Sequence, residues 1–549
     1  MPMRSTWRAR RPLAVVAMLL LVASASAEAA DTTARHGRPG PTTFPRTWSD
    51  FNGDGFADAA VGIPGETVDG IKGAGAVLIF YGSDAGLSAA GSQLLKMGRE
   101  LAPGGFGAPR TADALGSSLA AGDVNDDGYA DLLIGAPDQP GDSLSAIVKQ
   151  HVGAICVTYG GPGGLGDLVG CLPGYLIRDE ANLRLGASVV IADIFDEDGM
   201  NLPDGRGDIV IGSPGYEGGR GAVYLLKPST MDAVAARGSR PAGRGPLPVV
   251  TLEGKQPGER FGSVLAAGSI GRGLADDLVV GVPQRDVAVN GQKKVDAGAV
   301  DIIYDGKLTD GARVTVRQGS GVGDVPEAGD RFGAAVAVGD VTSDGWDDVV
   351  VGAPQEDLGG KADTGIVHVL KTLQLGELGA GFRVLSMASS VVPGNSAAGD
   401  LFGSALAIGE LGDPDGLLGL DLAVGVPGRT VNGRAGAGAV VAFASNGGDV
   451  GGVAQLVTQD SPQIGDTAEK GDGFGAALFA GEYGRGGSGV VIGIPREDVG
   501  AVKDAGAVQV LYAGTTTLLV TAGARFITQE TTGVPGQRGA GDRMGFSIR

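Results

Sequence analysis

Residues 332–354, FGAAVAVGDVTSDGWDDVVVGAP, contain three features in order: a Phe-Gly step, an acidic loop and an apolar run that ends in Gly-Ala-Pro. The first feature recurs with a variable apolar residue before the glycine, at Leu115, Leu185, Phe261, Phe332, Phe402, Phe474 and Met544. Successive openings are 70, 76, 71, 70, 72 and 70 residues apart. So regular a period indicates one structural unit repeated along the chain.

Each unit has room for four short strands. An apolar run ends in Gly-x-Pro seven times, at Pro64, Pro137, Pro214, Pro283, Pro354, Pro427 and Pro495. A β-rich segment such as 76–81 or 507–512 follows, and then a fourth such as 313–316. The pattern predicts an all-β fold, a seven-bladed β-propeller of four-stranded antiparallel blades, because radial packing buries both faces of each sheet. The glycine of each Phe-Gly step is expected to fit a crowded inner strand.

The two ends of the repeat region are expected to complete one blade. The copy at Met544 stops at Arg549, before any acidic loop, whereas the first acidic loop begins at Asp50 with no Phe-Gly step before it. Aligning 544–549 with 332–337 leaves positions that residues 48–50 fill in register with 338–340. We therefore expect residues 43–549 to form a single ring that closes by pairing its N-terminal and C-terminal segments.

Composition excludes several classes of protein. The 549 residues include 101 Gly and 28 Pro, which disfavour a helical fold, and 43% apolar residues, which argue against disorder. A net charge of −20 argues against nucleic-acid binding and favours cations. Only His36, His151 and His368 are available for zinc sites or a Ser/His/Asp triad, and His368 alternates within a strand, where we expect a structural role.

Three nine-residue loops carry oxygen donors at positions 1, 3, 5 and 9, a glycine at position 6 and a main-chain carbonyl at position 7. The donor residues are Asp50, Asn52, Asp54, Phe56 and Asp58; Asp123, Asn125, Asp127, Tyr129 and Asp131; and Asp340, Thr342, Asp344, Trp346 and Asp348. This set suits Ca²⁺, a hard cation that takes six to eight oxygens. An EF-hand would need a glutamate at position 12, where Val61, Ile134 and Val351 stand. A metal-free Asn/Asp/Gly turn is the alternative.

Other units depart from this pattern. Asp193, Asp196, Asp198 and Asp208 span an insertion and form a candidate distorted site, the segment from Glu410 to Asp421 is a doubtful one, and segments 269–277 and 482–489 lack the donors. Residues 206–208 spell Arg-Gly-Asp, a cell-attachment tripeptide. Asp208, however, precedes an apolar run as Asp131 does, so we expect it to close a loop instead.

The first thirty residues have the features of a signal peptide. Arg4, Arg8, Arg10 and Arg11 precede an apolar stretch, 13–23, and small residues follow it. Eleven apolar residues are too few to span a bilayer, which takes about twenty. We expect residues 31–42 to be a flexible linker and the mature chain to be secreted, extracellular and without a membrane span. In an oxidising compartment Cys156 and Cys171 are expected to form a disulfide.

The Phe-Gly openings, Gly-Ala-Pro closings and acidic loops together resemble the FG-GAP repeats of the integrin α-subunit head and of related secreted bacterial proteins. The resemblance covers nearly the whole mature chain. It implies a seven-bladed propeller with calcium in its blade hairpins and a role in extracellular binding or adhesion. FG-GAP repeats also accompany a phospholipase domain in some proteins, so a secreted hydrolase or lyase with the propeller as scaffold is the alternative, and an active site of paired carboxylates stays open.

The expected partner is an extracellular protein or glycan, bound by a monomer. Loops between the second and third strands lie on the rim opposite the calcium hairpins, and their variation in length favours them as the recognition surface. They are 65–73, 138–152, 284–296, 355–363, 428–435 and 496–504. Several carry an acid beside a Lys or Arg, as at 285–286, 496–498 and 503–504, and we expect these charges to be exposed, which favours a polar ligand.

Overall fold

A computed structural model describes residues 49–98, 110–140, 150–166, 168, 170–178, 180–195, 203–235, 247, 249–271, 273, 275–304, 313–320, 322–372, 378–412, 419–484 and 487–549. The chain divides into two units, residues 1–39 and 40–549, and every described residue belongs to the second. The expected signal peptide, 1–30, and linker, 31–42, lie outside the described residues.

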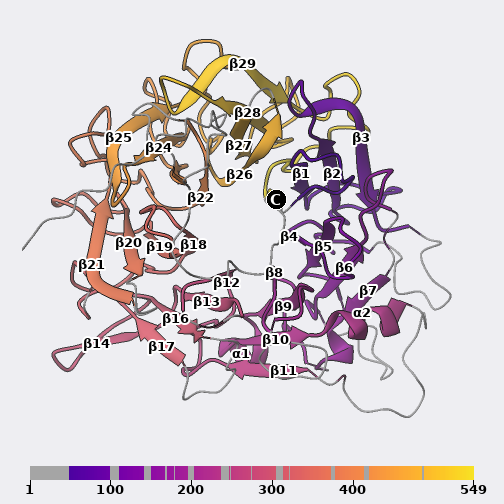
Figure 1. Cartoon of the computed structure of the whole chain (residues 1–549), viewed down its shortest axis with the longest axis horizontal. Coiled ribbons are helices and arrows are strands. Elements are labelled where there is room, and N and C mark those ends of the chain that lie inside the picture. Colours follow the sequence, from indigo (N-terminus) through magenta and orange to yellow (C-terminus); the bar gives the residue numbers. More distant parts are fainter. Residues whose placement is uncertain are drawn as a thin grey trace, which may run out of the picture. The chain divides into compact units, whose positions relative to one another are not determined.

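The second unit is an all-β, seven-bladed propeller whose small antiparallel sheets form a ring (Figure 1). Six blades have four strands each from one continuous stretch of chain. Blade 2 has β4 (Ser118–Gly122), β5 (Asp131–Ala136), β6 (Ala154–Thr158) and β7 (Gly170–Pro173); blade 3 has β8 (Ser188–Ala192), β9 (Asp208–Ser213), β10 (Ala222–Leu226) and β11 (Val250–Glu253); blade 4 has β12 (Val264–Gly268), β13 (Asp277–Val282), β16 (Ala299–Ile303) and β17 (Arg313–Val316).

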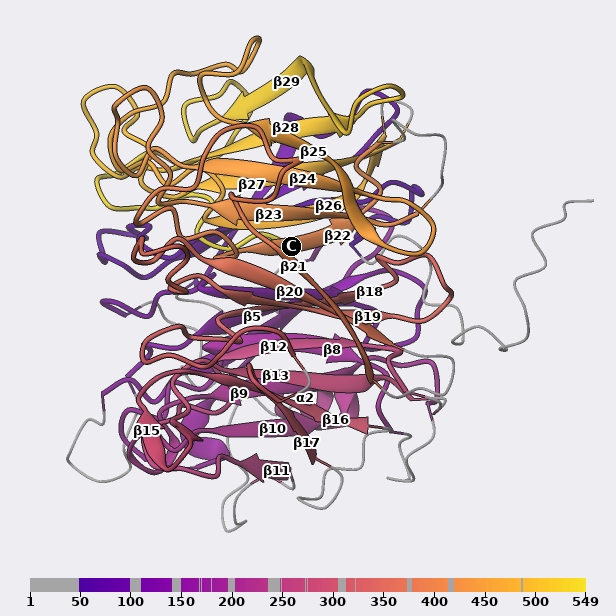
Figure 2. The ribbon, with the colours of Figure 1, turned by 90° about the vertical axis from the view of Figure 1, so that its left-hand side faces the viewer.

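The remaining blades continue the order around the ring. Blade 5 has β18 (Ala335–Gly339), β19 (Asp348–Ala353), β20 (Ile366–Thr372) and β21 (Leu378–Leu385); blade 6 has β22 (Leu406–Gly409), β23 (Asp421–Val426), β24 (Ala439–Ser445) and β25 (Val450–Val457); blade 7 has β26 (Ala477–Gly484), β27 (Gly487–Ile494), β28 (Ala507–Ala513) and β29 (Leu519–Ile527). Seen from the side, the sheets of blades 7, 6, 5 and 4 lie one above another (Figure 2). The first strand of each lies towards the centre of the ring.

A few additional elements lie outside the blade sheets, all in segments that connect strands. A short hairpin of β14 (Val287–Val289) and β15 (Gln292–Lys294) lies in blade 4, and η1 (Gly174–Leu176), α1 (Tyr216–Gly219) and α2 (Pro228–Ala235) are short helices. None of the helices in the described part of the chain is long and apolar enough to cross a membrane.

Blade 1 is completed by the end of the chain, as expected from the sequence. Its own strands are β1 (Ala59–Ile63), β2 (Ala76–Tyr81) and β3 (Ser88–Lys96). Antiparallel to β1 lies the C-terminal segment, with Val61 opposite Ile548. Ala60 N donates to Arg549 O over 2.6 Å, and Arg549 N donates back over 2.9 Å. The ring is therefore closed by backbone hydrogen bonds between residues almost 490 positions apart.

The Phe-Gly step is where each blade docks on the one before it. Phe332 is fully buried between blade 4 and blade 5, and its N–H donates to Ala297 O over 3.0 Å. Gly333 follows at φ +90°, and a Cβ there would lie 2.6 Å from Ala299 O. The glycine is thus required by its left-handed backbone and by the preceding blade, two residues before the inner strand that the sequence pattern assigned it to.

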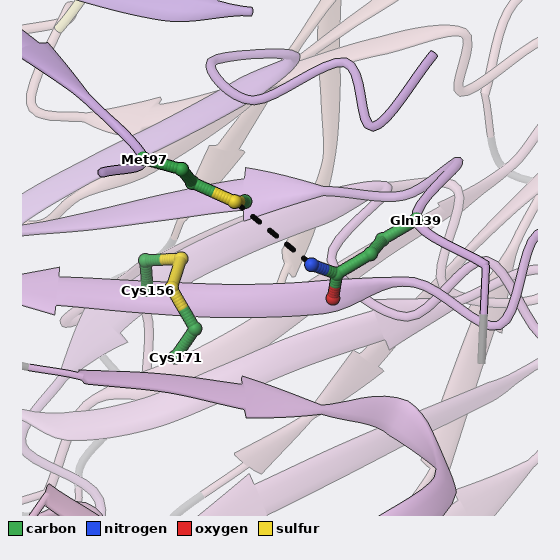
Figure 3. The surroundings of a disulfide bond; sticks show 4 residues. All are labelled: Met97, Gln139, Cys156 and Cys171. Carbon is green, nitrogen blue, oxygen red and sulfur yellow. Dashed lines mark hydrogen bonds between the residues drawn. A yellow bond between two sulfur atoms is a disulfide. The ribbon is translucent and has the colours of Figure 1, made fainter. Parts of the chain in front are cut away.

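The expected disulfide is present. Cys156 in β6 lies directly opposite Cys171 in β7, and their sulfurs are bonded (Figure 3). The bond joins the third and fourth strands of blade 2, so it secures the outer edge of that sheet.

Candidate metal sites

The acidic loop of blade 1 is folded by its own carboxylates. Asp50 Oδ1 accepts hydrogen bonds from the N–H groups of Gly53 and Asp54, at 2.7 and 3.1 Å, and Oδ2 accepts one from Gly55 at 2.9 Å. Asp54 Oδ1 accepts from Phe56 N at 3.0 Å. Gly55 has φ +90°, which an L side chain would strain. The chain thereby turns back on itself and carries its oxygen donors around the turn.

The loops of blades 2 and 5 repeat this arrangement. The position-1 carboxylate accepts from the N–H groups at positions 5 and 6: Asp123 from Asp127 and Gly128, at 3.3 and 2.9 Å, and Asp340 from Asp344 and Gly345, at 2.9 and 2.8 Å. The position-6 glycines have φ of +87° and +89°. Since the same bonds recur, the three loops predicted from the sequence share one backbone conformation.

Blade 3 contains a fourth loop of this kind, and its fifth position is Asp204. Asp193 accepts from the N–H groups of Asp204 and Gly205, at 3.1 and 3.0 Å, and Asp204 accepts from Arg206 N at 3.0 Å. Gly205 has φ +90°. The insertion therefore lies between positions 1 and 5, and Asp208 follows at position 9. Asp196 and Asp198, the interior ligands expected from the sequence, lie outside the described residues.

Asp204 was not predicted, because the loop positions were counted forward from Asp193 and the insertion shifts that count. Counted backward from Asp208, the spacing Asp-Gly-x-x-Asp at 204–208 is the same as that at 54–58. Asp208 is 2% exposed and accepts hydrogen bonds from Ile194 and Phe195. Its burial agrees with a place in the loop and not with an accessible attachment tripeptide.

The position-9 aspartates are buried and hold two segments together. Asp58 accepts from Phe51 N in its loop and from Gly82 N after β2, both at 2.8 Å, and Asp131 accepts from Val124 and Gly160 at 2.9 Å. Burial raises the pKa of Asp58 to about 8 and that of Asp131 to about 7, with the other loop aspartates adding to the rise. Ionising these carboxyls is therefore costly unless a cation lies nearby.

The position-9 aspartate does not by itself mark a metal site. Asp421 in blade 6 accepts from Leu411 and Ser445, both at 2.9 Å, although the loop before it lacks the regular donors. In blade 4, Asp277 likewise accepts from Gly271 N. These bonds tie the loop to the sheet with or without an ion, so the candidate sites are defined by positions 1 and 5. In the doubtful loop of blade 6, Glu410 is described, whereas Asp413 and Asp415 are not.

The donor chemistry of four loops fits Ca²⁺. Blade 1 would hold it with Asp50, Asn52, Asp54, the carbonyl of Phe56 and Asp58, all oxygen donors. In blade 5, Lys371 Nζ lies 3.2 Å from Asp344 Oδ2, so one ligand already has a cationic partner. The loop carboxylates are not the most tightly clustered acids in the described part of the chain: there, Glu327, Asp330 and Glu356 alone bring three carboxylate oxygens within 4.8 Å of one another.

The two described histidines differ in setting. His368 in β20 is fully buried, its ring lies 5.3 Å from that of Phe332, and burial lowers its pKa to about 4. This agrees with the structural role expected for it. His151 is partly exposed, with Nδ1 3.2 Å from Asp138 Oδ1.

Family models match three stretches of this chain, residues 47–80, 115–148 and 332–370, and all three are described as FG-GAP repeat. The chain contains FG-GAP repeats. Each matched stretch includes one of the three complete acidic loops, and the units between them carry the same Phe-Gly and Gly-x-Pro landmarks in a more divergent form.

The FG-GAP chain is similar to two groups of curated proteins. It is 33% identical over 178 residues to Integrin alpha-PS2 of Drosophila melanogaster, and the aligned region covers 32% of this chain and 12% of that protein. It is 35% identical over 175 residues to the Phosphatidylinositol-glycan-specific phospholipase D of Mus musculus, 32% of this chain and 18% of that one. It is 28% identical over 249 residues to Integrin alpha-V of Gallus gallus, an alignment that covers 44% of this chain and 20% of that protein. The matches thus span at most about a fifth of these three relatives.

Proposed function

We propose that this FG-GAP propeller is a secreted calcium-binding protein that acts as an extracellular binding or adhesion module. The observation that carries the proposal is the common loop fold in blades 1, 2, 3 and 5, where the same hydrogen bonds surround the same acidic positions. Metal-free turns would not need three or four oxygen donors in each of four loops. The similarity to integrin α subunits supports a binding role.

Calcium would act by stabilising the propeller. Each loop gathers several carboxylates, and the buried position-9 member is costly to ionise in the folded chain. A cation that binds the native loop and not the unfolded chain offsets this cost and raises stability by mass action. The loops also join the first and second strands of a blade, so the ions would secure the hairpins from which the ring is built.

The partner surface is proposed on the opposite rim, where the second-to-third-strand loops lie. Four of these loops are closed by short backbone bridges, Val68 with Ile71, Leu358 with Lys361, Val431 with Arg434 and Val499 with Val502. Such compact turns on a rigid ring can bind a partner without a large ordering cost. The charge pattern expected there needs correction, because Arg285 and Glu497 are buried, 4% and 1% exposed. The exposed charges include Lys293 and Lys503, paired with Asp286 and Asp498.

A pull-down with the mature chain, residues 31–549, tests the binding role. Immobilised chain is incubated with extracellular proteins and with a glycan array, in calcium and in chelator. Captured partners are measured again with a variant whose bridged loop tips, 68–71, 358–361 and 499–502, are replaced by Gly/Ser turns. We expect calcium-dependent capture that the loop replacement abolishes. A general hydrolase screen runs in parallel, and turnover without partner capture would favour the hydrolase or lyase alternative.

A further inference from the structure

One backbone position recurs at the interfaces between blades, on the rim opposite the acidic hairpins. It is the second residue after the proline of Gly-x-Pro. In blade 5 this is Glu356, whose N–H donates to Ala353 O over 3.2 Å and whose carbonyl accepts from Gly365 N over 3.0 Å. The same two bonds fix the equivalent residue in blades 1, 2, 4, 6 and 7, which is Glu66, Gln139, Arg285, Arg429 and Glu497. These six side chains therefore start from equivalent places.

In blades 4 and 6 the position holds an arginine, which neutralises an acid from the blade-to-blade crossing. Arg285 Nε lies 2.7 Å from Glu259 Oε2, and Arg429 NH1 lies 2.9 Å from Asp400 Oδ2. Both acids stand two residues before a Phe-Gly step, and both are 1% exposed. A buried carboxylate is thus balanced by a cation supplied by the protein itself.

In blades 5 and 7 the same position holds a glutamate, although the crossing still supplies buried acids. Glu356 and Asp330 are each 2% exposed, and with the exposed Glu327 they bring one oxygen each within 4.8 Å of one another. Blade 7 has the same Glu-x-x-Asp spacing in Glu469 and Asp472, with Glu497 at the equivalent position, but these three described acids do not bring one oxygen each within 4.8 Å of one another. Blade 1 has Glu66 opposite the buried Asp542, although Gly539 stands where the exposed glutamate would be. Like charges have therefore replaced an ion pair at three interfaces.

A glutamine accompanies the glutamate at each of these interfaces. Gln318, which follows β17 of blade 4 and is 1% exposed, donates from Nε2 to Glu356 Oε2 over 2.7 Å. Its Oε1 is buried and has no hydrogen-bond partner among the described residues. Gln459 likewise donates from Nε2 to Glu497 Oε2 over 2.7 Å, and its Oε1 is also buried without a hydrogen-bond partner among the described residues. Exchanging the amide O and N would not help, because Oε1 would then face the carboxylate.

The glutamine is specific to interfaces where a glutamate lies opposite. In the interface between blades 1 and 2 its place is taken by Met97, whose Sδ lies 3.9 Å from Nε2 of Gln139 (Figure 3). In the interface with Arg429 the place is taken by Met387. Thus the buried amide oxygen occurs with the additional carboxylate and is absent from the interface where arginine supplies the charge.

We propose that Glu327, Asp330, Glu356 and Gln318 form a Ca²⁺ site between blades 4 and 5. Carboxylate and amide oxygens are the donors that a hard cation takes, at about 2.3–2.6 Å, and oxygens within 4.8 Å of one another can share such an ion. The ion has the role that the guanidinium has in blades 4 and 6. The exposed Glu327 gives it access to solvent.

The experiment counts bound calcium in variants that copy the chain's own alternative. Mature chain is stripped with chelator, and its calcium isotherm is measured by equilibrium dialysis with radioactive calcium for the wild type, Glu356→Arg and Glu497→Arg. Glu356→Arg should remove one bound ion per chain while the chain stays folded in chelator, because an arginine is accommodated at this position in blades 4 and 6. Glu497→Arg makes the same substitution where the three acids do not cluster, so it should remove none. Asp69→Ala, which removes an exposed carboxylate on the same rim, should remove none.

A second variant guards against misfolding of the first. Glu327→Ala removes an exposed ligand and leaves the buried pair intact, and it should weaken one class of site at least tenfold. Unchanged stoichiometry in Glu356→Arg and an unchanged isotherm in Glu327→Ala would overturn the proposal, and would mean that a proton is held between the carboxyls. The hairpin sites are tested separately by Asp344→Ala, so a failure there leaves the interface result interpretable.

Discussion

The hairpin between the first and second strands is built differently in blades 5 and 7. In blade 5, Gly339 pairs with Asp348 and the eight residues between form the acidic loop. In blade 7, Gly481 pairs with Gly489 at the equivalent place, and the ladder continues to a pair formed by Gly484 and Gly487. A Cβ at Gly489 would lie 2.4 Å from Leu511 O, so the buried carboxylate has no room there. A hairpin held by its own backbone needs no acid, whereas the longer loop depends on buried carboxylates and, in our proposal, on calcium.

The largest loss of stability is expected in blade 1, where the C-terminal segment supplies the strand that pairs with β1. Deleting residues 544–549 removes the strand that pairs with β1 and the fully buried Met544. The ring should open and expose strand edges, so the variant should aggregate. Size-exclusion chromatography with light scattering measures this, with deletion of the predicted linker, 31–42, as the control. A monomer as stable as the parent would refute the structural role of the closure.

Removing calcium should weaken the blades that have acidic loops and leave the blade 7 hairpin unaffected. Saturation at one hundred times the dissociation constant contributes about 2.7 kcal/mol for each site, so chelator should lower the melting temperature markedly. Asp344→Ala should remove one ion and make the chain less sensitive to chelator. Hydrogen exchange in chelator should rise in 340–348 before it rises in 481–489. Superimposable melting curves with and without chelator would contradict the prediction.

Without calcium, stability should fall as the pH rises from about 5 to 8. Burial raises the pKa of Asp58 to about 8, above its unfolded value, so in this window the folded chain holds a proton that the unfolded chain has lost. Each pH unit then costs about 1.4 kcal/mol for this carboxyl, or roughly 4 kcal/mol over the window. Calcium should cancel the trend, because it favours the ionised form. Urea denaturation at both pH values would show the trend reversed if the prediction is wrong.

Asp348→Ala should destabilise blade 5 even in chelator, whereas Asp344→Ala should not. The buried Asp348 accepts hydrogen bonds from Thr342 and Thr372, both at 3.0 Å. Removing it leaves two buried N–H groups without acceptors, at a cost of about 2 kcal/mol. Equal urea midpoints for the two variants in chelator would show that position 9 serves the ion alone.

The smallest change tests the reassigned loop of blade 3. Asp204→Ala should remove one bound ion, because Asp204 occupies position 5 there. Asp126→Ala is the matched control, an exposed aspartate at position 4 of the blade 2 loop. If Asp204→Ala retains full calcium stoichiometry, blade 3 has no site or uses other ligands.

The fold was predictable because its determinants are local and repeated. A Phe-Gly step, a Gly-x-Pro end and a constant spacing define each blade, and the unequal ends at Asp50 and Arg549 predicted how the ring closes. The reason for the glycine was not predictable in full. Gly333 is constrained by Ala299 of the preceding blade, a contact that no pattern within one repeat contains.

The candidate sites were predictable only where the loop has standard length. An insertion in blade 3 shifted the count, and Asp204 emerged only from its hydrogen bonds to Asp193. The interface acids were missed for a different reason. Gln318, Asp330 and Glu356 are separated by up to 38 residues, and their significance depends on burial against one another and on the comparison with Arg285 and Arg429.

Anomalous diffraction from crystals of the mature chain grown in calcium tests the central claim most directly. The account predicts a calcium peak inside the acidic loops of blades 1, 2 and 5, surrounded by the donors at positions 1, 3, 5, 7 and 9, and no peak in the hairpin of blade 7. Loops that keep the present hydrogen bonds and show no anomalous peak at saturating calcium would contradict it.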